Sequence, residues 1–67
     1  MQSVLFDKNI YNISDSRKWL KGHNFKYSGK VDTTQNYHRF RQYEPKKSHT
    51  YRTLNIKKGV KGIIRVN

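Results

Sequence analysis

The chain contains no cysteine, a single proline and only four acidic residues among 67. Without cysteine there is no disulfide, no thiolate metal site and no cysteine nucleophile. No apolar run approaches the roughly 20 residues that a membrane-spanning helix needs. The first charge, Asp7, comes too early for the apolar centre of a signal peptide. We therefore expect an intracellular protein that is not secreted and has no membrane partner.

The charged residues are mostly of one sign. Fifteen Lys and Arg against four Asp and Glu give a formal net charge of +11. Residues 36–67 hold nine of these cations and one acid, so this half of the chain produces most of the positive field. A strong positive field on a small protein favours a polyanion as partner.

The acids and histidines do not form a pattern typical of catalysis or metal binding. The four acids are scattered, whereas hydrolysis needs two converging carboxylates or a nucleophile beside its base. His23, His38 and His49 lie 15 and 11 residues apart, a spacing that matches no zinc site. We predict that the protein is not an enzyme, and we expect no metal site and no cofactor. The acids are Asp7, Asp15, Asp32 and Glu44.

Length and composition predict one small domain that spans residues 1–67. A chain of this size buries only about 60% of the surface of its unfolded form. Hydrophobic residues make up 33% of it and nine residues are aromatic, so the large rings must supply much of the core.

One helix is predicted near the start of the chain. Apolar positions at helical spacing favour a helix over residues 13–23. Asn12 is suited to cap its first turn, and Asn24 is suited to the left-handed conformation that often ends a helix. An apolar run over residues 2–7 predicts a strand before it.

The second half of the chain predicts strands. Residues 36–43 alternate in polarity, and residues 51–56 and 60–66 predict a hairpin that turns at Gly59. Residues 31–34 are either a short extended piece or an irregular approach to the next strand. The order β-α-β-β-β predicts an α+β fold, with one helix packed on an antiparallel sheet of three or four strands.

Aromatic and cationic side chains alternate in the strand predicted over residues 36–43. Tyr37, Arg39, Arg41 and Tyr43 would share one face, where guanidinium groups attract phosphates and tyrosine rings stack on bases. Whether Arg52 joins this face depends on strand pairing, which the sequence does not determine. An ordinary solvated strand face is the alternative. The candidate nucleic-acid-binding residues also include Lys46 and Lys47 in a loop, Lys57 and Lys58 at the hairpin turn, and Lys61.

Several stretches together resemble a known family. They are residues 17–26 with Trp-Leu, residues 31–37 with Val-Asp-Thr-Thr, residues 39–42 reading Arg-Phe-Arg-Gln, and residues 51–53 with 59–61. The combination resembles a small, largely uncharacterised domain that recurs in large DNA viruses and tailed bacteriophages. The resemblance implies a viral context, in the virion interior or in the cytoplasm or nucleus of a host cell.

The charge and the resemblance together predict a small basic viral-type protein that binds nucleic acid, DNA or RNA. Binding would be mainly electrostatic, with weak sequence preference. The alternative is a structural virion protein or interaction module, which docks an acidic protein partner or assembles with further copies of itself.

Overall fold

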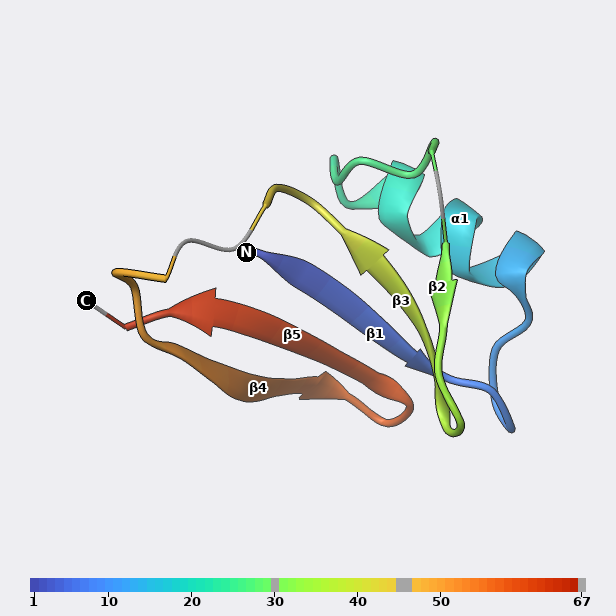
Figure 1. Cartoon of the computed structure of the whole chain (residues 1–67). Helices are drawn as coiled ribbons and strands as arrows, with labels where there is room; N and C mark the ends of the chain where they lie inside the picture. The colour runs from blue at the N-terminus through green and yellow to red at the C-terminus, as the bar shows by residue number, and fades with distance from the viewer. Residues whose placement is uncertain (30, 45–46, 67) are drawn as a thin grey trace.

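One helix lies beside an antiparallel sheet of five strands (Figure 1). The computed structural model describes residues 1–29, 31–44 and 47–66. The strands lie in the order β2-β3-β1-β5-β4, with β1 at the centre. The predicted α+β architecture is confirmed. The elements are β1 (Ser3–Asp7), α1 (Ile13–Gly22), β2 (Asp32–Thr33), β3 (Tyr37–Arg41), β4 (Tyr51–Lys57) and β5 (Val60–Arg65).

The shortest strand, β2, corrects the predicted number of strands. Asp32 pairs with Arg39 and Thr33 with His38, and the backbone N–H of Thr34 donates to the carbonyl oxygen of Tyr37 at 2.9 Å to close the turn into β3. Two residues are fewer than the four to eight that make a strand recognisable in a sequence. The sheet therefore has five strands, not the three or four that were predicted.

Both ends of α1 use the predicted residues. The side-chain oxygen of Asn12 accepts a hydrogen bond from the backbone N–H of Asp15 at 2.7 Å, which satisfies one of the free amides of the first turn. At the other end Asn24 has a φ of 61°, and the N–H of Phe25 donates to the carbonyl of Leu20 at 2.9 Å. This is the Schellman pattern of helix termination, and it ends the helix at Gly22, one residue before the predicted end.

The core lies between α1 and the sheet. Phe6 is at its centre, with its ring edge-on to the rings of Tyr11, Trp19 and Phe40 at centroid distances of 5.4 to 5.6 Å. Edge-to-face pairs at such distances add to the energy of hydrophobic burial. Among the described residues, the buried apolar side chains are those of Val4, Phe6, Leu20, Phe40 and Val60.

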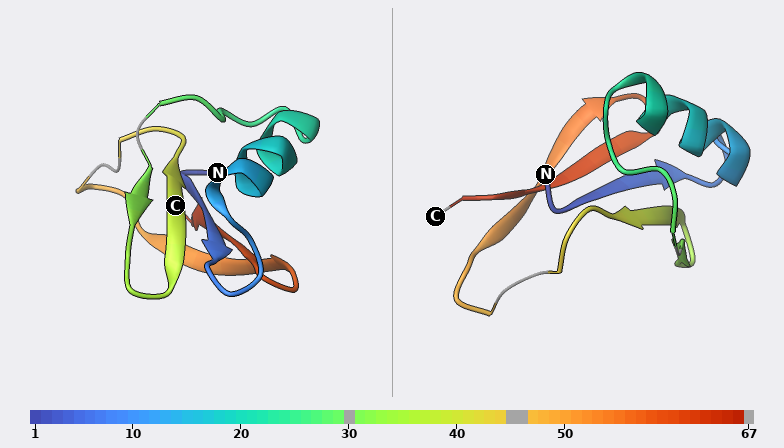
Figure 2. Two further views of the ribbon diagram at one scale, coloured as in Figure 1. Left: turned by 90° about the vertical axis from the view of Figure 1, so that its right-hand side faces the viewer. Right: turned by 90° about the horizontal axis from the view of Figure 1, so that it is seen from above.

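The helix covers one face of the sheet only, and the two views of Figure 2 agree on this. Val4 and Phe6 point toward α1, so their cross-strand partners Phe40 and Val60 point the same way. Alternate residues point to the other side, which we call the open face. Its members are Ser3, Leu5 and Asp7 from β1, Asp32 from β2, Tyr37, Arg39 and Arg41 from β3, Lys61, Ile63 and Arg65 from β5, and Tyr51, Thr53 and Asn55 from β4.

Strands β4 and β5 form the predicted hairpin. Lys58 and Gly59 make the turn, and Gly59 has a φ of 81°, the positive value expected of a glycine there. A bulge between Asn55 and Lys57 shifts the register near this turn. In the left view of Figure 2, β4 runs across the direction of β2 and β3, because the twist accumulates from strand to strand.

Candidate nucleic-acid interface

The open face brings two cations together across three neighbouring strands. Leu5 of β1 pairs with Arg39 on one side and with Lys61 on the other. Two strand spacings separate the backbones of these cations, a distance of about 10 Å. Within the part of the chain that the structure describes, neither Arg39 nor Lys61 forms an ion pair. Both charges are therefore available to a ligand that carries phosphates.

Tyr37 adds an aromatic ring to this pair of cations. The ammonium nitrogen of Lys61 lies 5.5 Å from the centroid of the Tyr37 ring, a cation–π contact that joins β5 to β3 across β1. Asp7 faces Tyr37 in the register of β1 and β3, and one of its oxygens accepts the backbone N–H of Asn9 at 2.8 Å. The ring is half-buried, so part of its surface is open to a planar ligand.

Arg39 contacts two buried polar side chains, Gln2 and Ser3, of which Ser3 lies on the same face of the sheet. Its Nε donates to Ser3 Oγ at 3.4 Å and one terminal nitrogen donates to Gln2 Oε1 at 3.5 Å. Gln2 and Ser3 are essentially inaccessible to solvent, and the hydroxyl of Ser3 donates to the same amide oxygen at 2.6 Å. These partners are neutral and form no ion pair with Arg39, and Asp32, which lies opposite Arg39 in the register of β2 and β3, forms its ion pair with Arg41 instead.

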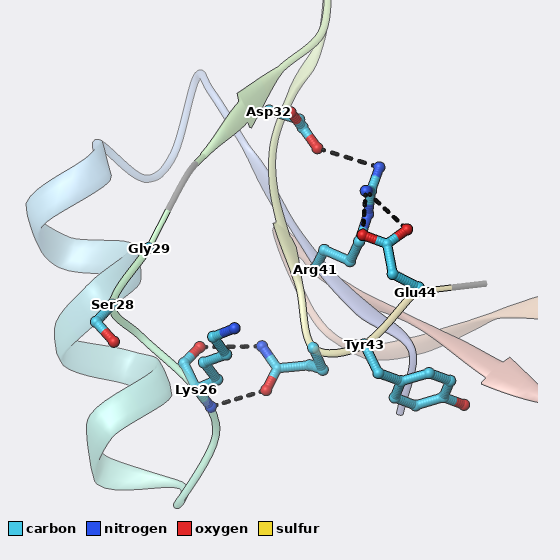
Figure 3. A pocket seen from close by; sticks show the side chains of 8 residues that line it. Lys26, Ser28, Gly29, Asp32, Arg41, Tyr43 and Glu44 are labelled. Carbon is cyan, nitrogen blue, oxygen red and sulfur yellow. Dashed lines mark hydrogen bonds and ion pairs between the residues drawn. The ribbon is translucent and has the colours of Figure 1, made fainter.

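Arg41 differs from Arg39, because acids surround it. Its guanidinium lies 3.5 Å from Asp32 Oδ2 and 3.3 Å from Glu44 Oε1, and Figure 3 shows both carboxylates directed toward it. These groups line an open pocket of about 530 Å³ whose wall also includes Lys26 and Gly29. The two acids match the charges of Arg41 and Lys26, so this pocket attracts phosphate much less than the open face does.

Tyr43 does not extend the open face as predicted. Strand β3 ends at Arg41, because the N–H groups of Gln42 and Tyr43 both donate to the carbonyl of Gln2, at 2.7 and 3.4 Å. Two donors on one acceptor are typical of a bulge, and a bulge breaks the alternation that would align Tyr43 with Tyr37. Tyr37 begins β3, whereas Tyr43 lies two residues beyond its end, at the rim of the pocket with an exposed ring.

The remaining candidates are spread over other surfaces. Arg52 pairs with Ile64 and lies on the helix side of the sheet, so it does not join Arg39. Lys57 ends β4 and Lys58 lies in the hairpin turn, near the Lys61 end of the open face. Lys47 is exposed in the loop before β4, and Lys46 lies outside the described residues.

The structure places one further cation, Arg65, on the open face. It pairs with Tyr51 and stands two alternations beyond Lys61 along β5. The sequence contained a signal for it, because Lys61, Ile63 and Arg65 follow the period of two in the last predicted strand. Arg65 was not among the predicted binding residues, because only the pairing of β5 with β1 and β4 places it on the same face as Arg39.

Among the described residues, no group of three or more His, Asp or Glu side chains is arranged to hold a metal ion. Nor does that part of the chain contain a helix with the length and apolar character needed to cross a bilayer.

No family model, no curated protein and no solved structure matches the chain.

Proposed function

We propose that the protein binds nucleic acid through the open face of its sheet, mainly by electrostatic attraction and with weak sequence preference. The observation that carries the proposal is the cluster of Tyr37, Arg39 and Lys61, which combines a ring and two unpaired cations on a face that no helix covers. A sheet face that carries both aromatic rings and cations suits a single-stranded nucleic acid, because the bases stack on the rings and the phosphates bind the cations.

The contact between Lys61 and Tyr37 suggests how a single strand would engage. A base that stacks on Tyr37 would replace the ammonium group on that side of the ring, since both occupy the space above the ring. The displaced ammonium of Lys61 would then reach the neighbouring phosphate. Arg39, already oriented by Gln2 and Ser3, would contact a second phosphate without a large loss of side-chain entropy.

The sequence resemblance to a viral domain suggests the source of the nucleic acid. We infer a viral or host nucleic acid, met in the virion interior or in the infected cell. The net charge of +11 supports a polyanionic partner from either source, because a field of that strength accelerates association with any polyanion.

The test is a titration of fluorescently labelled single- and double-stranded oligonucleotides at two salt concentrations, with polyglutamate of matched charge as competitor. Affinity should fall steeply with salt, because each neutralised phosphate releases condensed counterions. Single strands should bind more tightly than duplexes, because only unpaired bases can stack on Tyr37. Equal competition by polyglutamate and by unlabelled oligonucleotide would reduce the activity to nonspecific charge attraction and would refute the proposal.

Matched variants locate the interface. Lys61→Gln should lower the slope of log affinity against log salt by about 0.7 for single strands, which corresponds to one phosphate contact. Lys18→Gln removes the same charge from the exposed side of α1 and should leave that slope close to the wild-type value. Tyr37→Leu should weaken binding of single strands by about 1–3 kcal/mol and affect duplexes much less. Equal effects of Lys61→Gln and Lys18→Gln would exclude the open face as the interface.

A further inference from the structure

Strand β4 forms an outer edge of the sheet. It has seven residues, pairs with β5 along one side, and occupies the last position in the strand order (Figure 1). Among the described residues, no strand pairs with the side of β4 that faces away from β5. An outer strand of this length presents backbone donors and acceptors with which another extended chain can pair.

The hydrogen-bond pattern identifies the residues that face this edge. The N–H of Asp7 donates to the carbonyl of Gly59 at 2.9 Å, so the alternation along β5 points Lys61 and Ile63 toward β1. Gly62 and Ile64 then bond to Leu54 and Arg52 of β4. The intervening residues Thr53 and Asn55 must direct their backbone groups away from β5.

A second hydrogen bond gives the same alternation independently. The N–H of Val66 donates to the carbonyl of Thr50 at 2.9 Å, so every second residue after Thr50, namely Arg52 and Leu54, directs its backbone groups toward β5. Among the described residues, no hydrogen bond from the backbone of Thr53 or Asn55 to another element is found. Both residues are exposed. They therefore offer a short set of main-chain groups for an added strand.

The side chains of β4 complement this backbone edge on the helix side. Leu54 is 40% exposed, and Arg52 precedes it by two residues on the same side. An added strand would cover Leu54 with an apolar side chain placed opposite it. A carboxylate two residues along would lie near Arg52.

The charge of this region selects the kind of occupant. Residues 51–61 contain Arg52, Lys57, Lys58 and Lys61 and no acid. A second copy of the chain would bring another net charge of +11 to the same edge, and like charges disfavour that approach. An acidic segment brings the complementary charge.

We propose that the outer edge of β4 binds an extended acidic segment of another protein as a sixth strand, with main-chain hydrogen bonds to Thr53 and Asn55, an apolar side chain over Leu54 and a carboxylate at Arg52. This site is separate from the open face, so it does not rest on the proposed binding of nucleic acid. The pairing supplies affinity through backbone bonds, and the side chains of alternate residues supply selectivity.

The test uses a synthetic peptide as long as β4, seven residues, in which valines alternate with threonines and both ends carry glutamate. The same peptide with every backbone amide methylated keeps its charge but cannot pair as a strand. Binding is measured by fluorescence anisotropy, and backbone amide exchange of the full protein is measured by NMR. The parent peptide should bind about tenfold more tightly than the methylated one, and exchange at Thr53 and Asn55 should slow.

Charge variants complete the experiment. Arg52→Gln should lower the affinity for the parent peptide several-fold, whereas Lys18→Gln should leave that affinity unchanged, although both variants remove one exposed positive charge. Equal binding of the parent and methylated peptides would overturn the proposal, as would the absence of binding by the parent peptide. Slower exchange at Thr53 and Asn55 on raising the protein concentration alone would overturn it in favour of self-association.

Discussion

Individual polar side chains hold the loop between α1 and β2 against the sheet. Gln42 accepts the backbone N–H of Lys26 at 2.7 Å and donates to the carbonyl of Lys26 at 3.0 Å, so one amide side chain substitutes for a strand partner. Arg17 donates to the carbonyl of Tyr27 at 2.7 Å, and its guanidinium lies 5.6 Å from the centroid of the Phe40 ring. Some of the arginine and glutamine in this basic chain is therefore structural.

Replacing Gln42 tests this role. Gln42→Ala removes both bonds to Lys26 and should lower the free energy of unfolding by about 1–2 kcal/mol. Gln35→Ala is the matched control, because Gln35 is exposed in the turn before β3 and should change stability by less than about 0.5 kcal/mol. Urea denaturation followed by tryptophan fluorescence measures both. Equal stability of the two variants would show that the bonds to Lys26 contribute nothing.

Asn24 supports a second prediction at this scale. Its φ of 61° strains most side chains, whereas asparagine and glycine adopt such values readily. Asn24→Ala should destabilise the protein by about 1 kcal/mol, and Asn24→Gly should stay within about 0.5 kcal/mol of the wild type. Thermal unfolding followed by circular dichroism measures the stabilities of the two variants and the wild type. An alanine variant as stable as the glycine variant would contradict the left-handed conformation of this residue.

At the scale of the elements, two glycines at the ends of elements have opposite requirements. A Cβ at Gly59, in the β4–β5 turn, would lie 2.9 Å from Ile10 Cδ1 and 3.1 Å from Tyr11 Cε2, and the φ there is 81°. A Cβ at Gly22, the last residue of α1, would meet no atom within 4 Å. The hairpin turn is therefore packed against the segment that precedes the helix, whereas the helix end is open.

Alanine at each glycine gives opposite outcomes. Gly59→Ala should cost about 1–3 kcal/mol, because it adds both left-handed strain and a clash with Ile10. Gly22→Ala should stabilise the protein by up to about 1 kcal/mol, because alanine favours the helix. Chemical denaturation of both variants measures the difference. A neutral Gly59→Ala would mean that the turn is not packed against Ile10.

The elements also show how far local sequence signals reach. Asn12 correctly predicted the start of the helix, Asn24 its end and Gly59 the hairpin turn. Capping and positive φ depend on neighbours within a few residues, so the sequence nearby is sufficient to predict them. Strand β2 was one of two alternatives that the sequence left open for residues 31–34, because its two residues gain their extended form from pairing with β3. The end of β3 was placed at Tyr43 instead of Arg41, because the bulge depends on the distant carbonyl of Gln2.

At the scale of the whole molecule, the positive charge affects stability and binding in opposite directions. The net charge of +11 repels itself in the folded protein, and added salt screens this repulsion. The same salt weakens the attraction to phosphates.

Salt should therefore stabilise the free protein while it weakens its binding to oligonucleotides. A gain on the order of 1 kcal/mol between low and physiological salt would raise the Tm by about 4–8 °C. Calorimetry at several NaCl concentrations measures this rise. The double variant Lys47→Gln and Lys58→Gln neutralises two exposed lysines, lowers the net charge from +11 to +9, and should reduce the rise. A Tm that is independent of salt would show that the charges are already matched locally.

The amino-acid sequence by itself determined the net charge, the place of the helix and its two ends, and the hairpin turn at Gly59. Composition and local backbone preference suffice for these, since each depends on residues that are near in the chain or on a sum over all of them. The tertiary structure decided which cations act together. Register set Arg39 beside Lys61 through Leu5, moved Arg52 to the other face, and surrounded Arg41 with Asp32 and Glu44. Strand pairing between distant residues fixes that register, and the sequence pattern along one strand does not contain it.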